Sequence, residues 1–437
     1  MSKKLIKGGE IFSSEWTKKA DILIENGKIL KIDVNIEDNE AELVDASGKM
    51  IMPGVIDPQV HFREPGLTHK EDLRTGSMSA AAGGVTSFLE MPNTNPLTTS
   101  VAAMDEKKKI ASEQCVVNYN FFIGATADNI EELNAVENVA GIKIFMGAST
   151  GDLLVSEEKD LDHIFKHANK LIAVHAEDDS MVKNNEKKFV GSENFDDHRK
   201  IRSVEAAVAA TKLALKLSDK YDQRLHILHL TTEDEVEILK DYVDNPYVSS
   251  EVCPQHFQLT APDVYQKLGS YAQMNPPIRT ERHNKGLLKG LKDGIIDCIA
   301  TDHAPHTHEE KSKPFGSAPS GMPGVQTSLP LMLNLASKGE FAYNDIVKWM
   351  CEKPTELYKI KNKGYLKEGY DADIAIVDKE EVWTLKEEDL FYKCGWSPYT
   401  GWDFTGRVKM TLVGGEIIFE NGKINEDVRG TEIEMGD

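Results

Sequence analysis

Short runs of β-favouring residues alternate with helix-compatible segments through the middle of this chain, and no other sequence feature limits the fold as strongly. The runs are Ile51–Ile56, Val85–Glu90, Val116–Phe122, Gly141–Met146, Leu171–His175, Leu225–Leu230, Val248–Cys253 and Ile295–Asp302. Segments such as Asp72–Ala82, Glu157–Asn169 and Val204–Ser218 separate most of them. This alternation is typical of βαβ units, which form a parallel sheet. Eight units within about 250 residues predict an α/β fold of the (β/α)₈, TIM-like barrel type.

A doubly wound open sheet is the alternative arrangement of the same units. Such sheets usually carry the motif Gly-x-Gly-x-x-Gly after an early strand, where the chain turns into a helix. The sequence has no such motif after its first β-favouring runs. The barrel is therefore the favoured prediction.

The two ends of the sequence share a different pattern, in which short strands are joined by tight turns. Asp21–Ile24 and Lys28–Ile32 flank an Asn-Gly pair, which is a strong hairpin signal. The pentapeptide Glu-Asn-Gly-Lys-Ile occurs at 25–29 and again at 420–424. Two unrelated hairpins would also fit this pattern. We predict instead one small β-sandwich domain, built from residues 1–50 and 360–437, beside a barrel of residues 51–359.

The chain is strongly acidic, with 51 Lys and Arg against 72 Asp and Glu, a formal net charge of −21. Binding to nucleic acid or to an anionic membrane requires clustered Lys and Arg, so neither partner is expected. The five cysteines are scattered without CxxC spacing, and neither a signal peptide nor a long apolar run is evident. These features predict a cytoplasmic protein. An anionic substrate would need positive charge gathered locally.

Polar residues that are unusual in strands lie at the same end of successive predicted strands. They are Gln59, His61, Arg63, Asn93, Lys143, His175, His229 and Asp302. A single strand-end histidine is more often structural, and Asp302 alone could be a helix N-cap. In a barrel, however, these ends meet at one rim, where active sites are found. Three histidines and an aspartate there predict a divalent metal, most plausibly zinc, which lowers the pKa of bound water toward about 7.

Lys143 requires a separate interpretation, because an ammonium group cannot bind a metal cation. A buried lysine with a lowered pKa can react with CO₂ to form a carbamate, and a carbamate can bridge two metal ions. This modification is a hypothesis drawn from the position of Lys143 and from the resemblance described next.

Several motifs resemble those of the dihydroorotases, a family of cyclic amidohydrolases, over essentially the whole chain. They are Pro53-Gly54-Val55-Ile56-Asp57, Val60-His61-Phe62-Arg63-Glu64-Pro65-Gly66, Glu90-Met91-Pro92-Asn93-Thr94, Leu228-His229-Leu230-Thr231, Met274-Asn275-Pro276-Pro277 and Ala300-Thr301-Asp302-His303-Ala304-Pro305-His306. The resemblance implies reversible interconversion of N-carbamoyl-L-aspartate and dihydroorotate in de novo pyrimidine (UMP) biosynthesis. The expected partner is a small anionic substrate, with homo-oligomers left open.

The resemblance also implies roles for individual residues. His61, His175 and His229 would bind metal, and Lys143 falls at the position of a carboxylated lysine that bridges two zinc ions in some members. Asp302 would contact one metal and act as the general acid and base. The substrate would be held by Arg63, Asn93, Asn275 and His306, with Ser320-Gly321 at the position of a substrate-contacting loop.

One departure from the family pattern concerns the metal site. The family normally begins this site with His-x-His, whereas this chain has Gln59-Val60-His61. An amide oxygen is a much weaker zinc ligand than imidazole. Gln59 therefore binds weakly, or only one metal binds well, or the chain is a catalytically weak homologue that serves as a scaffolding subunit. The other candidate site residues are intact, which favours an active enzyme. Allantoinase or hydantoinase activity is the other alternative, against which Arg63 argues.

Overall fold

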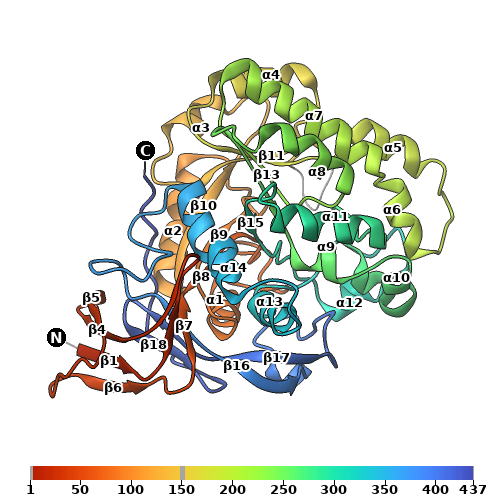
Figure 1. Cartoon of the computed structure of the whole chain (residues 1–437). Helices are drawn as coiled ribbons and strands as arrows, with labels where there is room; N and C mark the ends of the chain where they lie inside the picture. Colours follow the sequence, from red (N-terminus) through yellow and green to blue (C-terminus); the bar gives the residue numbers. More distant parts are fainter. Residues whose placement is uncertain (1–2, 148–152, 437) are drawn as a thin grey trace.

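The computed structural model describes residues 3–147 and 153–436, and its centre is a barrel of eight parallel strands (Figure 1). These are β8 (Val55–Val60), β9 (Val85–Glu90), β10 (Asn118–Gly124), β11 (Gly141–Phe145), β12 (Ile172–His175), β13 (Leu225–Ile227), β14 (Val248–Val252) and β15 (Cys298–Ile299). A parallel bridge from Val60 to His303 joins the first strand to the segment after the last. The predicted (β/α)₈ barrel is confirmed.

Helices surround the barrel, and several begin at residues that suit an N-cap (Figure 1). They are α1 (Leu73–Ala82), α2 (Val101–Gln114), α3 (Ile130–Ala135), α4 (Glu158–His167), α5 (Asp179–Glu186), α6 (His198–Ile201), α7 (Val204–Tyr221), α8 (Glu233–Leu239), α9 (Pro254–Gln258), α10 (Asp263–Leu268), α11 (Glu281–Lys292), α12 (His308–Lys311), α13 (Ser328–Ser337), α14 (Tyr343–Val347) and α15 (Lys353–Tyr358). The Asp72 carboxylate, for example, accepts a hydrogen bond from Thr75 N at 2.8 Å. This bond satisfies an amide that the helix itself leaves free.

Strands from both ends of the chain form two further sheets beside the barrel (Figure 1). The strands are β1 (Lys3–Lys7), β2 (Glu10–Phe12), β3 (Thr17–Lys19), β4 (Asp21–Glu25), β5 (Lys28–Asp33), β6 (Glu42–Asp45), β7 (Met50–Pro53), β16 (Ile374–Thr384), β17 (Asp403–Val413), β18 (Glu416–Glu420) and β19 (Lys423–Ile424). One sheet has the order β5-β4-β1-β6, and the other β19-β18-β17-β16-β7-β2-β3. Both predicted Asn-Gly turns join antiparallel strands. A shared apolar core, with Ile22 and Leu412 among its members, lies between the sheets.

The first predicted strand, Ile51–Ile56, is wrong as a single element. Residues 50–53 form β7, which pairs with β16, and the barrel strand β8 begins only at Val55. Gly54 separates them, and a Cβ atom there would lie 2.1 Å from Thr86 Oγ1. The backbone of this run therefore passes from one sheet to another at a position where only glycine fits. The residues on both sides of Gly54 are buried, so the sequence pattern reads as one continuous strand and does not show the break.

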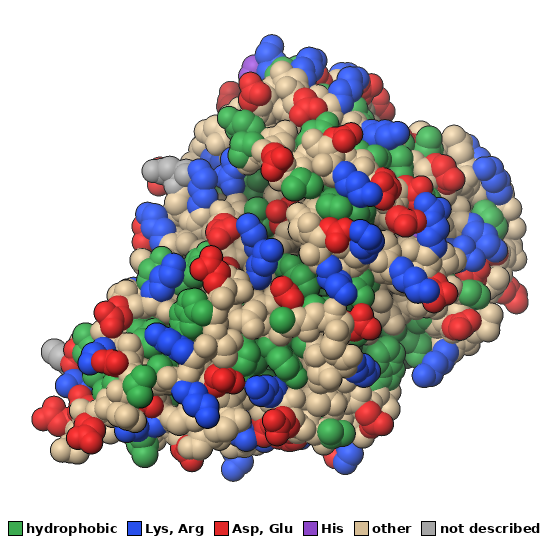
Figure 2. Space-filling view, viewed as in Figure 1, with side chains coloured by type: hydrophobic (Ala, Val, Ile, Leu, Met, Phe, Trp, Pro, Cys, Tyr) green, Lys and Arg blue, Asp and Glu red, His purple; other side chains and the backbone are tan. Residues whose placement is uncertain are grey.

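Acidic and basic side chains are interspersed on the face shown in Figure 2. The net charge of −21 is thus not expressed there as a single acidic patch. Within the described part of the chain, none of the helices is both long and apolar enough to cross a membrane.

Candidate active site

A pocket at the carboxyl ends of the barrel strands brings together most of the residues predicted from the sequence. Its lining is Gln59, His61, Arg63, Asn93, Lys143, Phe145, His175, His229, Asn275, Asp302, Ala304, Ser320 and Gly321. His306 does not line it but lies directly behind, with Nε2 3.3 Å from Arg63 Nη2. Much of this lining lies in, or directly after, the barrel strands β8, β9, β11, β12, β13 and β15. Its assembly therefore depends on the closed parallel sheet.

His61 and Asp302 form one side of the pocket floor. His61 Nε2 lies 3.0 Å from Asp302 Oδ1, and His61 Nδ1 lies 2.7 Å from Asn93 Oδ1. An amide oxygen can only accept, so Nδ1 donates to Asn93 and Nε2 is directed into the pocket. Gln59 Nε2 donates to the same Asp302 oxygen at 3.2 Å. The Asp302 carboxylate thus accepts from Gln59 and lies beside the unprotonated Nε2 of His61.

His175 and His229 form the other side. His175 Nδ1 lies 3.0 Å from His229 Nε2, and both side chains are almost fully buried. Burial lowers the pKa of each imidazole, so two neutral rings turn their nitrogens toward one another. Two imidazole nitrogens that converge in this way are suited to share a cation.

Lys143 lies within β11 and is 1% exposed, and its Nζ has no hydrogen-bond partner among the described residues. Burial lowers the pKa of this amine to about 7. An unpaired ammonium is costly in such a place, whereas a neutral amine is less so, and a carbamate anion would be stabilised by metal cations beside it. Gln59 Oε1 and His229 Nδ1 are also buried and unpartnered there. Imidazole nitrogens, a carboxylate and these unsatisfied atoms together fit a metal centre.

Glu177 holds His175 in place, and the sequence interpretation missed it. Glu177 Oε2 accepts from His175 Nε2 at 2.9 Å and also pairs with Arg202. Burial would raise the pKa of Glu177, but Arg202 and His175 lower it to about 2, so the carboxylate stays charged. This bond fixes the ring so that Nδ1 faces His229. Its position two residues after His175, at the same strand end, was the available signal.

Glu177→Gln tests this orienting role. The amide keeps the size of the side chain but loses the charge that both partners use. We expect metal affinity to fall about 10- to 100-fold, as is common when the partner of a metal-binding histidine is removed. Metal retention during dialysis against a weak chelator measures the effect. Glu158→Gln, on the exposed face of α4, is the control; equal retention by the two variants would contradict the assignment.

Arg63 supplies positive charge to the lining of the pocket. Its side chain is 2% exposed, and Nε donates to Pro305 O at 3.2 Å. Burial lowers the pKa of the guanidinium only to about 10, so it remains charged at neutral pH. His306 beside it is neutral, because burial lowers its pKa to about 3. Arg63 is thus a local cation in a protein with a negative net charge, as binding of an anionic substrate would require.

Two further features complete the geometry of the pocket. His198 Nε2 lies 3.0 Å from Asn275 Oδ1 and 2.9 Å from Met274 O, which orients the Asn275 amide. Sequence reasoning gave His198 no role. Arg63, His229 and Asp302 all have positive φ angles, of 67°, 35° and 47°. Left-handed backbone at non-glycine residues is costly and gathers at functional sites.

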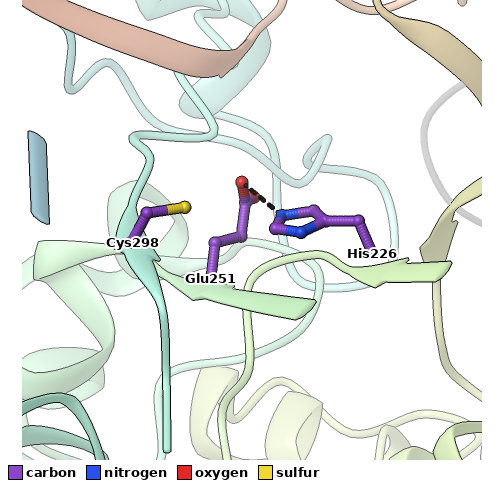
Figure 3. Close-up of side chains that lie close together, drawn as sticks. All are labelled: His226, Glu251 and Cys298. Atoms are coloured by element: carbon purple, nitrogen blue, oxygen red, sulfur yellow. Dashed lines mark hydrogen bonds and ion pairs between the residues drawn. The ribbon is translucent and has the colours of Figure 1, made fainter. Parts of the chain in front are cut away.

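A second group of metal-ligand types lies nearer the amino ends of the strands, where His226, Glu251 and Cys298 face one another (Figure 3). His226 Nε2 lies 3.1 Å from Glu251 Oε2, and His226 Nδ1 lies 2.8 Å from Ser249 Oγ. Both ring nitrogens are therefore already hydrogen-bonded. We interpret this group as a buried polar contact of the barrel interior, which joins the pocket through a hydrogen bond from His229 N to Glu251 Oε1 at 3.4 Å.

Known proteins resemble this chain over nearly its full length. Residues 50–418 match the amidohydrolase family. A dihydroorotase of Methanosarcina acetivorans is 36% identical, over 96% of this chain and 92% of its own length. A dihydroorotase of Bacillus cytotoxicus is 33% identical, over 95% of this chain and 98% of its own.

Solved structures agree on the fold. The L-hydantoinase (dihydropyrimidinase) of Arthrobacter aurescens superposes with a TM-score of 0.94 at 30% identity, covering 99% of this chain and all of its own. The dihydropyrimidinase of Brevibacillus agri gives a TM-score of 0.92 at 25% identity, covering 99% of this chain and 98% of its own. A barrel with a polar pocket at its carboxyl rim and these matches define an amidohydrolase. Within that class, the chain belongs to the dihydroorotase family.

Proposed function

We propose that this protein is a dihydroorotase that interconverts N-carbamoyl-L-aspartate and dihydroorotate. The observation that carries the proposal is the buried, charged Arg63 in the lining of a pocket that also gathers imidazole and carboxylate groups. Dihydroorotate carries groups that match both, a carboxylate for Arg63 and a reactive ring amide for the other groups. Hydantoin and allantoin carry no ring carboxylate, so their hydrolysis is the weaker candidate despite the hydantoinase-like fold.

A direct assay separates these candidates. Purified protein with quantified metal content would be given dihydroorotate, N-carbamoyl-L-aspartate, hydantoin and allantoin. We expect turnover of the first two in opposite directions and little of the others. Faster hydrolysis of hydantoin than of dihydroorotate would replace the proposal with the alternative, and no turnover at all would favour the scaffolding subunit.

Zinc is the metal that this donor set suits best. His61 and Asp302 would hold one zinc position, and His175 and His229 would hold a second. A carboxylated Lys143 would be the bridge between the two positions. When bound, zinc would supply a Lewis acid for the ring carbonyl and lower the pKa of water toward about 7. Measuring added CO₂ mass on Lys143 tests the bridge, and an unmodified lysine in a fully active protein would reject it.

The protein's own residues account for the remaining steps. Arg63 binds the substrate carboxylate through its planar fork, and the Asn93 and Asn275 amides orient the ring. Asp302 takes a proton from the attacking water and returns it to the leaving ring nitrogen. Ring closure follows the same path in reverse, with Asp302 starting in the opposite protonation state.

Because of Gln59, the zinc position at His61 and Asp302 has weaker ligands than the position at His175 and His229. Its Nε2 donates to Asp302 Oδ1, and its Oε1 is the weak neutral ligand that remains. We therefore expect about one tightly held ion per chain, on the side of His175 and His229.

Gln59→His is expected to raise the tightly held metal from about one to about two ions per chain. Imidazole is a much better zinc ligand than an amide oxygen, which gives the change its direction. Elemental analysis after desalting measures the ratio without reference to activity. Gln59→Leu, which removes the amide, should leave it near one. Two ions in the wild-type protein, reduced by Gln59→Leu, would show instead that Gln59 is an effective ligand.

The location of the enzyme and its partners are also part of the proposal. The scattered cysteines support a cytoplasmic location, and all five are buried and free of disulfides. A small anionic substrate, rather than nucleic acid or membrane, is the proposed partner. Light scattering on the purified protein would measure its oligomeric state.

A further inference from the structure

Lys311 is a buried lysine whose three hydrogen bonds all go to backbone carbonyls. It ends α12, is 0% exposed, and donates from Nζ to Gln273 O at 3.0 Å, Pro319 O at 2.9 Å and Gly321 O at 3.0 Å. Three donors and three acceptors saturate the ammonium group. No carboxylate of the described residues lies within ion-pair distance of this Nζ.

These bonds join two segments that line the pocket. Gln273 lies two residues before Asn275, and Pro319 and Gly321 flank Ser320. The same segments are tied further by Gly321 N, which donates to Gln273 O at 2.9 Å, and by Gln273 Nε2, which donates to Ser320 Oγ at 3.1 Å. Lys311 thus fixes the two segments that carry Asn275 and Ser320, and these two residues form one wall of the pocket.

The charge of Lys311 is not balanced within the protein. Burial and the like charge of Arg63 lower the pKa of Lys311 to about 7, against the Glu310 carboxylate, which raises it. The three carbonyl acceptors use all three N–H groups of Nζ and so favour the charged ammonium form. Glu310, however, pairs with Lys70 at 3.1 Å. Two buried cations with one shared carboxylate repel each other and are stabilised by an added anion. Ser320 O also accepts from His306 Nε2 at 3.0 Å, so the wall and the Arg63 region are coupled.

We propose that Lys311 is a positioning residue for anion recognition, which holds the wall of Asn275 and Ser320 against Arg63 and contributes an unbalanced positive charge behind it. The proposal rests on the proposed function only for the identity of the anion, a cyclic amide with a carboxylate. It gives a role to the charge of a buried lysine that has only backbone carbonyls as hydrogen-bond acceptors.

Lys311→Met tests the proposal, because methionine keeps most of the volume and loses the charge and the donors. We expect KM for dihydroorotate to rise at least tenfold, with kcat within about threefold and metal content unchanged. Calorimetry with two probes isolates the charge. Binding of orotate, a planar anion, should weaken about tenfold, while binding of neutral dihydrouracil should change less than about threefold. Lys311→Arg, which keeps the charge, should restore part of the orotate affinity.

Lys363→Met is the matched control, since Lys363 is also buried but pairs with Asp371 and Asp373 away from the pocket. It should lower Tm and leave both probe affinities unchanged. Equal weakening of both probes by Lys311→Met, or an unchanged KM, would overturn the proposal and leave Lys311 a structural residue. Because the probes are measured by binding, a wild-type protein that binds orotate but does not turn over dihydroorotate would refute the proposed function alone.

Discussion

Asp302→Asn is expected to lower kcat for dihydroorotate by at least about 10³-fold while metal content stays near the wild-type value. General acid–base groups contribute about 10²- to 10⁴-fold, and an amide can neither take nor return the proton. The substitution preserves shape, and the amide oxygen can still accept from Gln59 Nε2, as Asp302 Oδ1 does now at 3.2 Å. The loss should therefore appear in kcat, measured by steady-state kinetics beside elemental analysis.

Asp57→Asn provides the control in the same part of the barrel. Asp57 is buried and accepts from Thr301 N at 3.1 Å, and burial raises the pKa of its carboxyl to about 7. A neutral side chain is thus already well suited there, and we expect kcat to change less than about tenfold. If Asp302→Asn lost no more activity than Asp57→Asn, another group would have to be the acid and base.

Arg63→Lys is expected to raise KM for dihydroorotate about 100-fold with a much smaller change in kcat. Lysine keeps the charge but loses the planar fork that binds a carboxylate through two parallel hydrogen bonds. Loss of one partner of a buried charged pair commonly costs about 2–5 kcal/mol, and 100-fold corresponds to about 2.7 kcal/mol. Initial rates over a range of dihydroorotate concentrations separate KM from kcat.

Arg279→Lys controls for the loss of a buried arginine as such. Arg279 is 3% exposed and donates to Thr231 Oγ1 and to Arg202 O, away from the pocket lining. That variant should lose thermal stability and keep its KM. An unchanged KM in Arg63→Lys would remove Arg63 from substrate binding, and with it the main argument against a hydantoinase.

The barrel and most of the pocket lining were predictable because one rule connects them. Parallel strands bring their carboxyl ends to one rim, so polar residues at those ends must meet, and His175 and His229 do so at 3.0 Å. Their roles in metal binding and catalysis stay predictions, which the variants above address.

Other parts of the site had no signal of that kind. His198 and Lys311 act through contacts between segments far apart in the sequence, and each looks like an ordinary polar residue until the fold is known. The eighth strand is also shorter than its run predicted, with only Cys298–Ile299 in β15. At its amino end, Ile295 and Ile296 donate back to Gly290 O and belong to the turn that follows α11.

The continuity of β7 with β8 bears on how this protein emerges from the ribosome. Strand β7 pairs with β16, which is synthesised only after the whole barrel. The segment at 431–433 likewise bonds to Tyr119 in β10, with Ile433 N donating to Tyr119 O at 2.9 Å. The nascent barrel must therefore wait, with edges uncovered, for the last part of the chain, and chaperone protection during translation should matter more for its yield than for a barrel without such distant partners.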